Sequence, residues 1–179
     1  AYQKVDAPAA SNLEYSLQLA VTTADATAGA TEYFTACQVI EGYDIRDLVG
    51  KTFTVSFWVK SAVTGVYSLA LWNGAWAAGA DRFYIAEYTI DAANTWEYKT
   101  ITITGPTSGT WTITNTSGVY VFLDMGMGSN YRGTANSWTG SWYAGATGDT
   151  KQATLATVLN AAIAHVEAAT VTVALAQTL

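Results

Sequence analysis

The chain contains few residues that could carry out nucleophilic or acid–base chemistry. His165 is its one histidine and Cys37 its one cysteine, and the sequence contains no HExxH, CxxC or GxSxG motif. Cys37 lies in a strand-like run with no histidine–aspartate pair to activate it, so we expect a buried, small apolar side chain. These residues indicate a protein that is not an enzyme.

Carboxylates are scattered along the chain. Glycoside hydrolysis needs two of them, about 5 to 10 Å apart. Glu87, Glu97 and Asp124 fall on expected strands, but nothing in their spacing requires two of them to meet. Asp81 and Asp124 could ligate a structural Ca²⁺, without any ligand spacing that points to one. We therefore expect no cofactor, leave a structural calcium ion open, and assign no metal site.

Aromatic side chains are the strongest functional signal. There are seven Trp and eleven Tyr, many of them in segments rich in Gly, Ser and Asn that read as loops. An exposed ring can stack on a sugar, and rings also dominate protein interfaces. Three interpretations stay open: glycan contact, subunit contact, and rings that fold back to seal the domain. The expected contact residues are Trp72, Trp76, Tyr131, Trp138 and Trp142.

Length and composition fit one domain that spans residues 1–179. Only 12% of the residues are charged, about half the usual share, so neutral side chains must cover the surface. Such a surface favours a chain that assembles with others or works outside a cell. The net charge of -6 disfavours nucleic-acid binding, which needs a basic stripe. No signal peptide and no membrane span is expected from the hydropathy pattern.

Alternation of apolar and polar residues predicts an all-β fold. In residues 52–60, Phe53, Val55, Phe57 and Val59 share one face, while Trp58 and Lys60 fall on the other with Thr and Ser. Similar strands are expected at 15–21, 33–40, 66–72, 83–90, 97–104 and 119–127, with a helical turn at 43–49 capped by Asp44. The predicted core residues are Phe53, Val55, Phe57, Val59, Ile101, Ile103, Val121 and Leu123.

The two ends of the chain are harder to assign. Residues 1–14 are mixed and turn-like. In residues 152–179 apolar side chains recur near helical spacing, but β-branched residues favour closing strands. We expect strands there. On the apolar face of the strand at 119–127, Met127 is expected to follow Val119, Val121, Leu123 and Met125.

Three segments carry a resemblance to a known family: IEGYDIRDLVGKTFTVSFWVKS, AEYTIDAANTWEYKTITITGP and GSNY at 128–131. Over residues 15–143 the chain resembles carbohydrate-binding-module-like jelly-roll domains in tail-fibre and other surface proteins of marine tailed bacteriophages. The resemblance implies a jelly-roll β-sandwich of two antiparallel sheets. Residues 1–14 lack the aromatic opening strand that the family leads us to expect.

The resemblance also implies a function. It suggests a non-enzymatic virion surface component of a tailed phage, either a fibre or adhesin domain or a capsid-decoration domain, assembled in the host cytoplasm. Its expected partners are other virion subunits, in a homo-oligomer such as a fibre trimer or a capsid array, and a host cell-surface glycan. Nucleic acid and membrane are not expected partners. The alternative is a carbohydrate-binding module of a secreted polysaccharide-degrading system.

Overall fold

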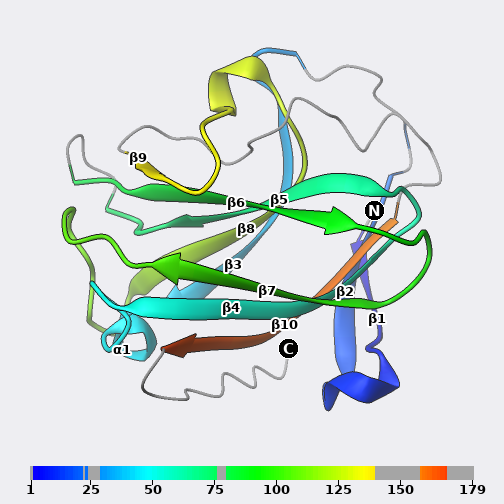
Figure 1. Cartoon of the computed structure of the whole chain (residues 1–179), viewed down its shortest axis with the longest axis horizontal. Helices are drawn as coiled ribbons and strands as arrows, with labels where there is room; N and C mark the ends of the chain where they lie inside the picture. Colours follow the sequence, from blue (N-terminus) through cyan, green and yellow to red (C-terminus); the bar gives the residue numbers. More distant parts are fainter. Residues whose placement is uncertain (1, 22, 24–28, 76–79, 140–157, 169–179) are drawn as a thin grey trace.

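The computed structural model describes residues 2–21, 23, 29–75, 80–139 and 158–168, and within 158–168 only the backbone. These residues form two five-stranded antiparallel sheets (Figure 1). Sheet A contains, in spatial order, β1 (Tyr2–Asp6), β2 (Tyr15–Ala20), β10 (Val158–Ala168), β4 (Thr52–Ser61) and β7 (Glu97–Thr104). Sheet B contains β3 (Tyr33–Glu41), β8 (Ser117–Met127), β5 (Gly65–Trp72), β6 (Phe83–Ile90) and β9 (Trp138–Thr139).

The main core lies between the two sheets, as the alternation predicted. Seven of the eight predicted core residues are buried, and Ile101 is partly buried against the same cluster. Inward-facing residues of sheet B, among them Tyr67, Leu69 and Tyr88, complete the cluster. The prediction of an all-β sandwich of antiparallel sheets is therefore confirmed, while the jelly-roll connectivity stays a prediction.

A second apolar cluster lies on the outer face of sheet B. Residues one position along from the inward-facing ones point away from the main core, because successive strand side chains alternate between faces. Met127 belongs to this cluster, so the expectation that it continues the face of Val121 and Leu123 was wrong. The pairing of β8 with β3 is irregular near Met125, and such a bulge exchanges the two faces. The cluster consists of Ala70, Trp72, Phe83, Ile85, Phe122 and Met127.

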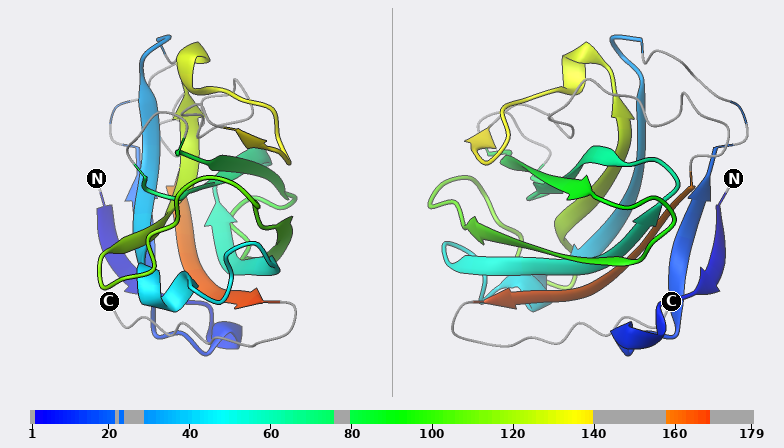
Figure 2. Two further views of the ribbon diagram at one scale, coloured as in Figure 1. Left: turned by 90° about the vertical axis from the view of Figure 1, so that its left-hand side faces the viewer. Right: turned by 45° about the vertical axis from the view of Figure 1, so that its right-hand side comes forward.

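The N-terminal segment contains a strand that the sequence did not predict. β1 pairs with β2 from Tyr2 opposite Leu19 to Asp6 opposite Tyr15, at the edge of sheet A (right view of Figure 2). The Gln3 side chain donates a hydrogen bond to Gln18 on β2. Lys4 places its ammonium 3.6 Å from the ring centre of Tyr15. These cross-strand pairs stabilise a strand whose own sequence has little apolar periodicity.

Two further sequence expectations are corrected. The short helix α1 spans Gly42–Ile45 with Glu41 at its N-cap, so Asp44 lies inside the helix and does not cap it. Cys37 is exposed on β3, an edge strand of sheet B, and was expected to be buried. A 3-10 turn, η1, spans Ala9–Ser11 and a second, η2, spans Ser129–Tyr131.

The closing strand is the one expected near the C-terminus. β10 pairs with β2 and β4 in the middle of sheet A, which confirms a strand at 158–168. The remainder of 152–179 lies outside the described residues. Within the described part of the chain, no helix has the length and apolar character needed to cross a membrane.

Two neighbouring tyrosines in the main core differ in how their hydroxyls are satisfied. The Tyr67 hydroxyl donates to the Val63 carbonyl at 2.8 Å and lies 2.6 Å from the Ser61 hydroxyl. The Tyr88 ring stacks on Tyr67 with centroids 5.8 Å apart, but its buried hydroxyl has no hydrogen-bond partner among the described residues. Burial raises the pKa of Tyr88, so this hydroxyl stays protonated.

We predict that Tyr88→Phe raises the free energy of unfolding by about 1 kcal/mol, because it removes a polar atom that was desolvated without compensation. Tyr67→Phe is the matched control. It should lower stability by about 1 kcal/mol, since it breaks two hydrogen bonds. Urea denaturation measures both, and a Tyr88→Phe protein less stable than the Tyr67→Phe protein would contradict the assignment.

Candidate functional site: an aromatic surface on sheet A

The five aromatic residues predicted to form a contact surface do not behave alike. Trp76 and Trp142 lie outside the described residues. Trp72, at the end of β5, is only 5% exposed, so the expectation of an exposed loop ring was wrong for this residue. Its ring stacks on Phe83 with centroids 5.3 Å apart, and its Nε1 donates to Asp81 Oδ1 at 2.8 Å.

A buried asparagine explains why Trp72 is held inside. Asn73 is fully buried, and its side-chain amide donates to the carbonyls of Ala80 and Thr110, each at 2.8 Å. Its side-chain oxygen accepts from the Arg82 N–H at 2.9 Å. These bonds join the end of β5 to the start of β6 and to the segment after β7. The described ends of this Gly- and Asn-containing segment are therefore held together by the Asn73 side chain.

Tyr131 and Trp138 are partly buried and pack on different clusters. Tyr131, in η2, packs against the second cluster and meets the Tyr33 ring edge-on at 5.6 Å. Trp138, on β9, packs against the main core beside Tyr84 and Trp111 and donates from Nε1 to the Thr104 carbonyl at 2.8 Å.

Trp111 and Trp138 also line a cavity of about 20 Å³ between the sheets. A cavity of that size holds about one water molecule, which excludes it as a sugar pocket. The three described residues of the predicted site are thus not brought together in one exposed surface.

A different set of rings lies on the outer face of sheet A. Trp58 on β4 is directly opposite Tyr98 on β7, with ring centroids 5.2 Å apart. Tyr98 is 50% exposed and Trp58 is half-buried. Just before β7, Trp96 lies beneath the ammonium of Lys60, which is 5.0 Å from its ring centre. We call Trp58, Lys60, Trp96 and Tyr98 the aromatic surface.

Hydroxyl groups flank these rings on the same face. Thr100 and Thr102 follow Tyr98 at alternate positions of β7 and are exposed. The Thr54 hydroxyl on β4 lies 3.0 Å from the Thr102 hydroxyl. Apolar rings next to hydroxyl groups provide both a stacking face and hydrogen-bond partners, which is the combination that a sugar needs.

One residue of the sequence points to the aromatic surface. Trp58 falls on the polar face of a strand whose other face is fully apolar. A large ring at such a position has no place in the core, and it therefore marks the outer face of the sheet. The contact rings were expected in loops, whereas Trp58 lies on a strand.

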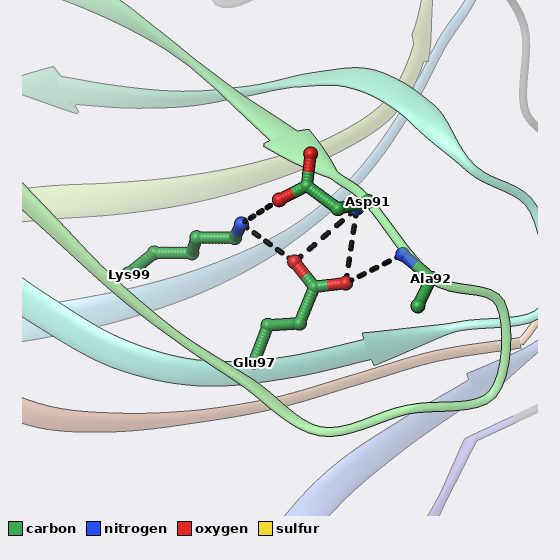
Figure 3. Close-up of polar contacts among 4 residues, drawn as sticks. All are labelled: Asp91, Ala92, Glu97 and Lys99. Carbon is green, nitrogen blue, oxygen red and sulfur yellow. Dashed lines mark hydrogen bonds and ion pairs between the residues drawn. The ribbon is translucent and has the colours of Figure 1, made fainter.

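A charged clamp fixes the turn that leads into Trp96 (Figure 3). The Glu97 carboxylate accepts hydrogen bonds from the Asp91 N–H at 2.9 Å and the Ala92 N–H at 2.8 Å. The Lys99 ammonium lies 2.6 Å from Glu97 and 3.1 Å from Asp91. The clamp holds the start of β7, and with it Trp96 and Tyr98, against the end of β6.

The clamp shifts the pKa values of Glu97 and Lys99, in each case in the direction that favours the charged form. Burial alone would raise the pKa of Glu97, but hydrogen bonds from Lys99, Ala92 and Asp91 outweigh it and lower the pKa below its ordinary value. Burial alone would lower the pKa of Lys99, but its bonds to Glu97 and Asp91 raise it. Glu97 therefore stabilises the fold above the unfolded glutamate pKa, and this contribution disappears as pH falls through the folded value. The contribution of Lys99 is complete below the unfolded lysine pKa and disappears as pH rises through the folded value.

The chain matches no protein-family model, and no curated protein matches it significantly. Among the described residues no group of three or more His, Cys, Asp or Glu side chains is placed to hold a metal ion. The two calcium candidates make protein contacts. Asp81 accepts from Trp72, while the buried Asp124 accepts from the Ser68 hydroxyl at 2.8 Å and the Gly126 N–H at 2.6 Å.

We predict that Glu97→Gln lowers the free energy of unfolding at pH 7 by about 2 kcal/mol, because it removes charge-assisted hydrogen bonds from a largely buried carboxylate. The difference from the wild type should begin to shrink as the pH falls below about 4, the value of an unfolded glutamate, and should disappear as the pH falls through the lowered folded pKa of Glu97. Urea denaturation at several pH values measures this. Exposed Glu87 provides the control, since Glu87→Gln should change little; a pH-independent difference for Glu97→Gln would contradict the clamp.

Trp72→Ala and Trp58→Ala should separate a core ring from a surface ring. We expect Trp72→Ala to lower the free energy of unfolding by about 3–5 kcal/mol, because it leaves a cavity in the second cluster. Trp58→Ala should cost about 1 kcal/mol or less, the value of one cross-strand pair. Thermal or urea unfolding measures both variants. Equal losses of unfolding free energy would contradict the prediction, because they would mean that the two rings are buried alike.

Proposed function

We propose that the chain is a non-enzymatic binding domain that attaches to glycans through the aromatic surface of sheet A. The observation that carries the proposal is the pair Trp58–Tyr98, which lies partly exposed among hydroxyl-bearing residues on an otherwise polar sheet face. A ring on a strand is held by its neighbours, so it loses little conformational freedom when a ligand stacks on it.

The setting that we propose for this binding is the virion surface of a tailed phage, as a fibre, adhesin or capsid-decoration domain in a homo-oligomer. Its support is the resemblance of the IEGYDIRDLVGKTFTVSFWVKS and AEYTIDAANTWEYKTITITGP segments to such domains. The same two segments supply the aromatic surface, since they contain β4 and β7. A carbohydrate-binding module of a secreted polysaccharide-degrading system would use the same surface and remains the alternative.

Contact with neighbouring subunits is a second candidate function, favoured by the position of β7. It is an edge strand of sheet A and has exposed side chains at Tyr98, Thr100 and Thr102. An edge strand has unpaired backbone groups that another chain can pair with. Glycan attachment and subunit contact differ in one respect, because only the first responds to free sugar.

The test is retention of the full chain on a panel of immobilised neutral and acidic polysaccharides. We expect Trp58→Ala to weaken retention by about 2 kcal/mol or more, the loss of one anchor ring. Tyr43→Ala is the matched control, because Tyr43 is 53% exposed but lies in α1, away from the aromatic surface. If no polysaccharide retains the wild type, or if Trp58→Ala binds as well as the wild type, the proposal is wrong.

A further inference from the structure

Two rows of register positions cross the outer face of sheet A. The first is the row of Tyr98 and Trp58, which lie opposite each other on β7 and β4. The second lies two residues further along β4, about 7 Å away. It begins at Trp96 and Lys60 and continues through the register positions of Asn160 on β10, Gln18 on β2 and Gln3 on β1.

The rows follow the order of the strands in the twisted sheet A, from β7 and β4 through β10 to β2 and β1 (Figure 1). Neighbouring strands are about 4.8 Å apart, which is close to the length of one sugar residue in an extended chain. Successive residues of a linear glycan that crosses the strands would therefore meet successive positions of a row. A glycan that ran along a strand would meet a side chain only about every 7 Å, because successive side chains alternate between the two faces.

The second row is cationic and amide-bearing. Lys60 is the one charged residue among the described side chains at outward-facing positions of sheet A. Gln18 and Gln3 are hydrogen-bonded to each other. They provide amide groups two and three strands away from β4, which carries Lys60. In the adjoining turn, Asp91 and Glu97 share the ammonium of Lys99, which takes up part of their charge.

Other ionisable positions of this face lie further along the strands. His165 and Glu167 on β10 occupy the register positions of Ser56 and Thr54. Thr54 is six residues from Lys60 along β4, about 20 Å in an extended strand. The end of the face at Lys60 can therefore attract an anion, while the register position of Glu167 is remote from it.

On the basis of the proposed function, we infer that the glycan is linear and acidic. The glycan crosses the strands of sheet A with one sugar ring stacked on Trp58 and Tyr98, and one of its carboxylates pairs with the Lys60 ammonium. The extended glycan then continues along the second row toward Gln18. The ligand class is a uronic-acid polysaccharide, since a uronate supplies both the apolar ring face and the carboxylate.

The test compares acidic polymers with the same polymers after carboxyl reduction, which removes the charge and keeps the backbone. Polygalacturonate and hyaluronan, each with its reduced form, are the probes, and the dissociation constant of the full chain is measured for all four. We expect each acidic form to bind at least about tenfold more tightly than its reduced form, the effect of one charge-assisted hydrogen bond. Lys60→Gln should bring the two forms within about twofold, whereas Trp58→Ala should weaken both forms alike.

Lys4→Gln is the matched control. Lys4 also lies over an aromatic ring, that of Tyr15, but on the opposite face of sheet A, so this variant should keep the full preference for the acidic forms. If the reduced polymers bind as well as the acidic ones and both depend on Trp58, glycan binding stands and the inference is wrong. If Lys60→Gln keeps the preference, the inference is also wrong. If none of the four polymers binds the wild type while a neutral polysaccharide of the panel does, the inference is wrong and the proposed function stands; if no polysaccharide of the panel binds either, both are wrong.

The direction of the chain is tested separately with galacturonate oligomers. Gln18 is two strands from Lys60, about 10 Å, so a disaccharide on Trp58 and Lys60 should not reach it but a hexasaccharide should. Gln18→Ala should therefore weaken the hexasaccharide severalfold and leave the disaccharide unchanged. Equal effects on both, or no effect on either, would overturn the path across the strands.

Discussion

The alternation of β4 links the core of this protein to its outer surface. Phe53, Val55, Phe57 and Val59 fill the space between the sheets, and every intervening residue must therefore point outward. A shift of one residue would move Trp58 and Lys60 into the core and the four apolar side chains into solvent, at a cost of several kcal/mol. The position of the aromatic surface is thus fixed by hydrophobic burial on the other side of the same strand. Pairing with β7 then places Tyr98 opposite Trp58, because the register that aligns Val55 with Ile101 determines all other pairs.

The two sheets treat their outer faces differently. On sheet B several outward residues of β5, β6 and β8 are apolar, and they form a second buried cluster around Trp72 and Phe83. Asn73 secures this arrangement with three side-chain hydrogen bonds. On sheet A the outward residues are threonine, serine and lysine with a few rings, so the rings stay partly exposed. Trp72 is therefore a core residue and Trp58 a partly exposed one because of the chemistry of their same-face neighbours, and not because of their distance from a turn.

Most of the fold could be predicted because its core strands obey a strict period of two. Ile103, Val121 and Leu123 were predicted to be buried on that basis, and they are.

The errors arise where the pattern is interrupted or where long-range contacts decide. The bulge near Met125 moves Met127 to the other cluster, and Gly126 within the strand pattern was its one local sign. β1 depends on cross-strand pairs with β2, which a single segment cannot reveal. Trp72 was expected to be exposed because it borders a segment rich in Gly, Ser and Asn, but the Asn73 side chain bonds to the carbonyls of Ala80 and Thr110, which no local pattern reveals. The site could have been found on β4, where Trp58 interrupts a polar face.

The proposed binding of a polysaccharide on an open sheet face has consequences for how the protein would work. Such a face buries less ligand surface than a pocket does, so one domain alone holds its ligand weakly. Several copies on one particle would convert weak contacts into stable attachment, because each further contact is intramolecular once the first has formed. The proposed homo-oligomer and the proposed shallow site therefore depend on each other. The net charge of -6 opposes the approach of an acidic polymer, but at physiological ionic strength the screening length is about 8 Å. At that range the charges nearest the aromatic surface, Lys60 and the clamp of Asp91, Glu97 and Lys99, act on a ligand more strongly than the net charge of the chain does.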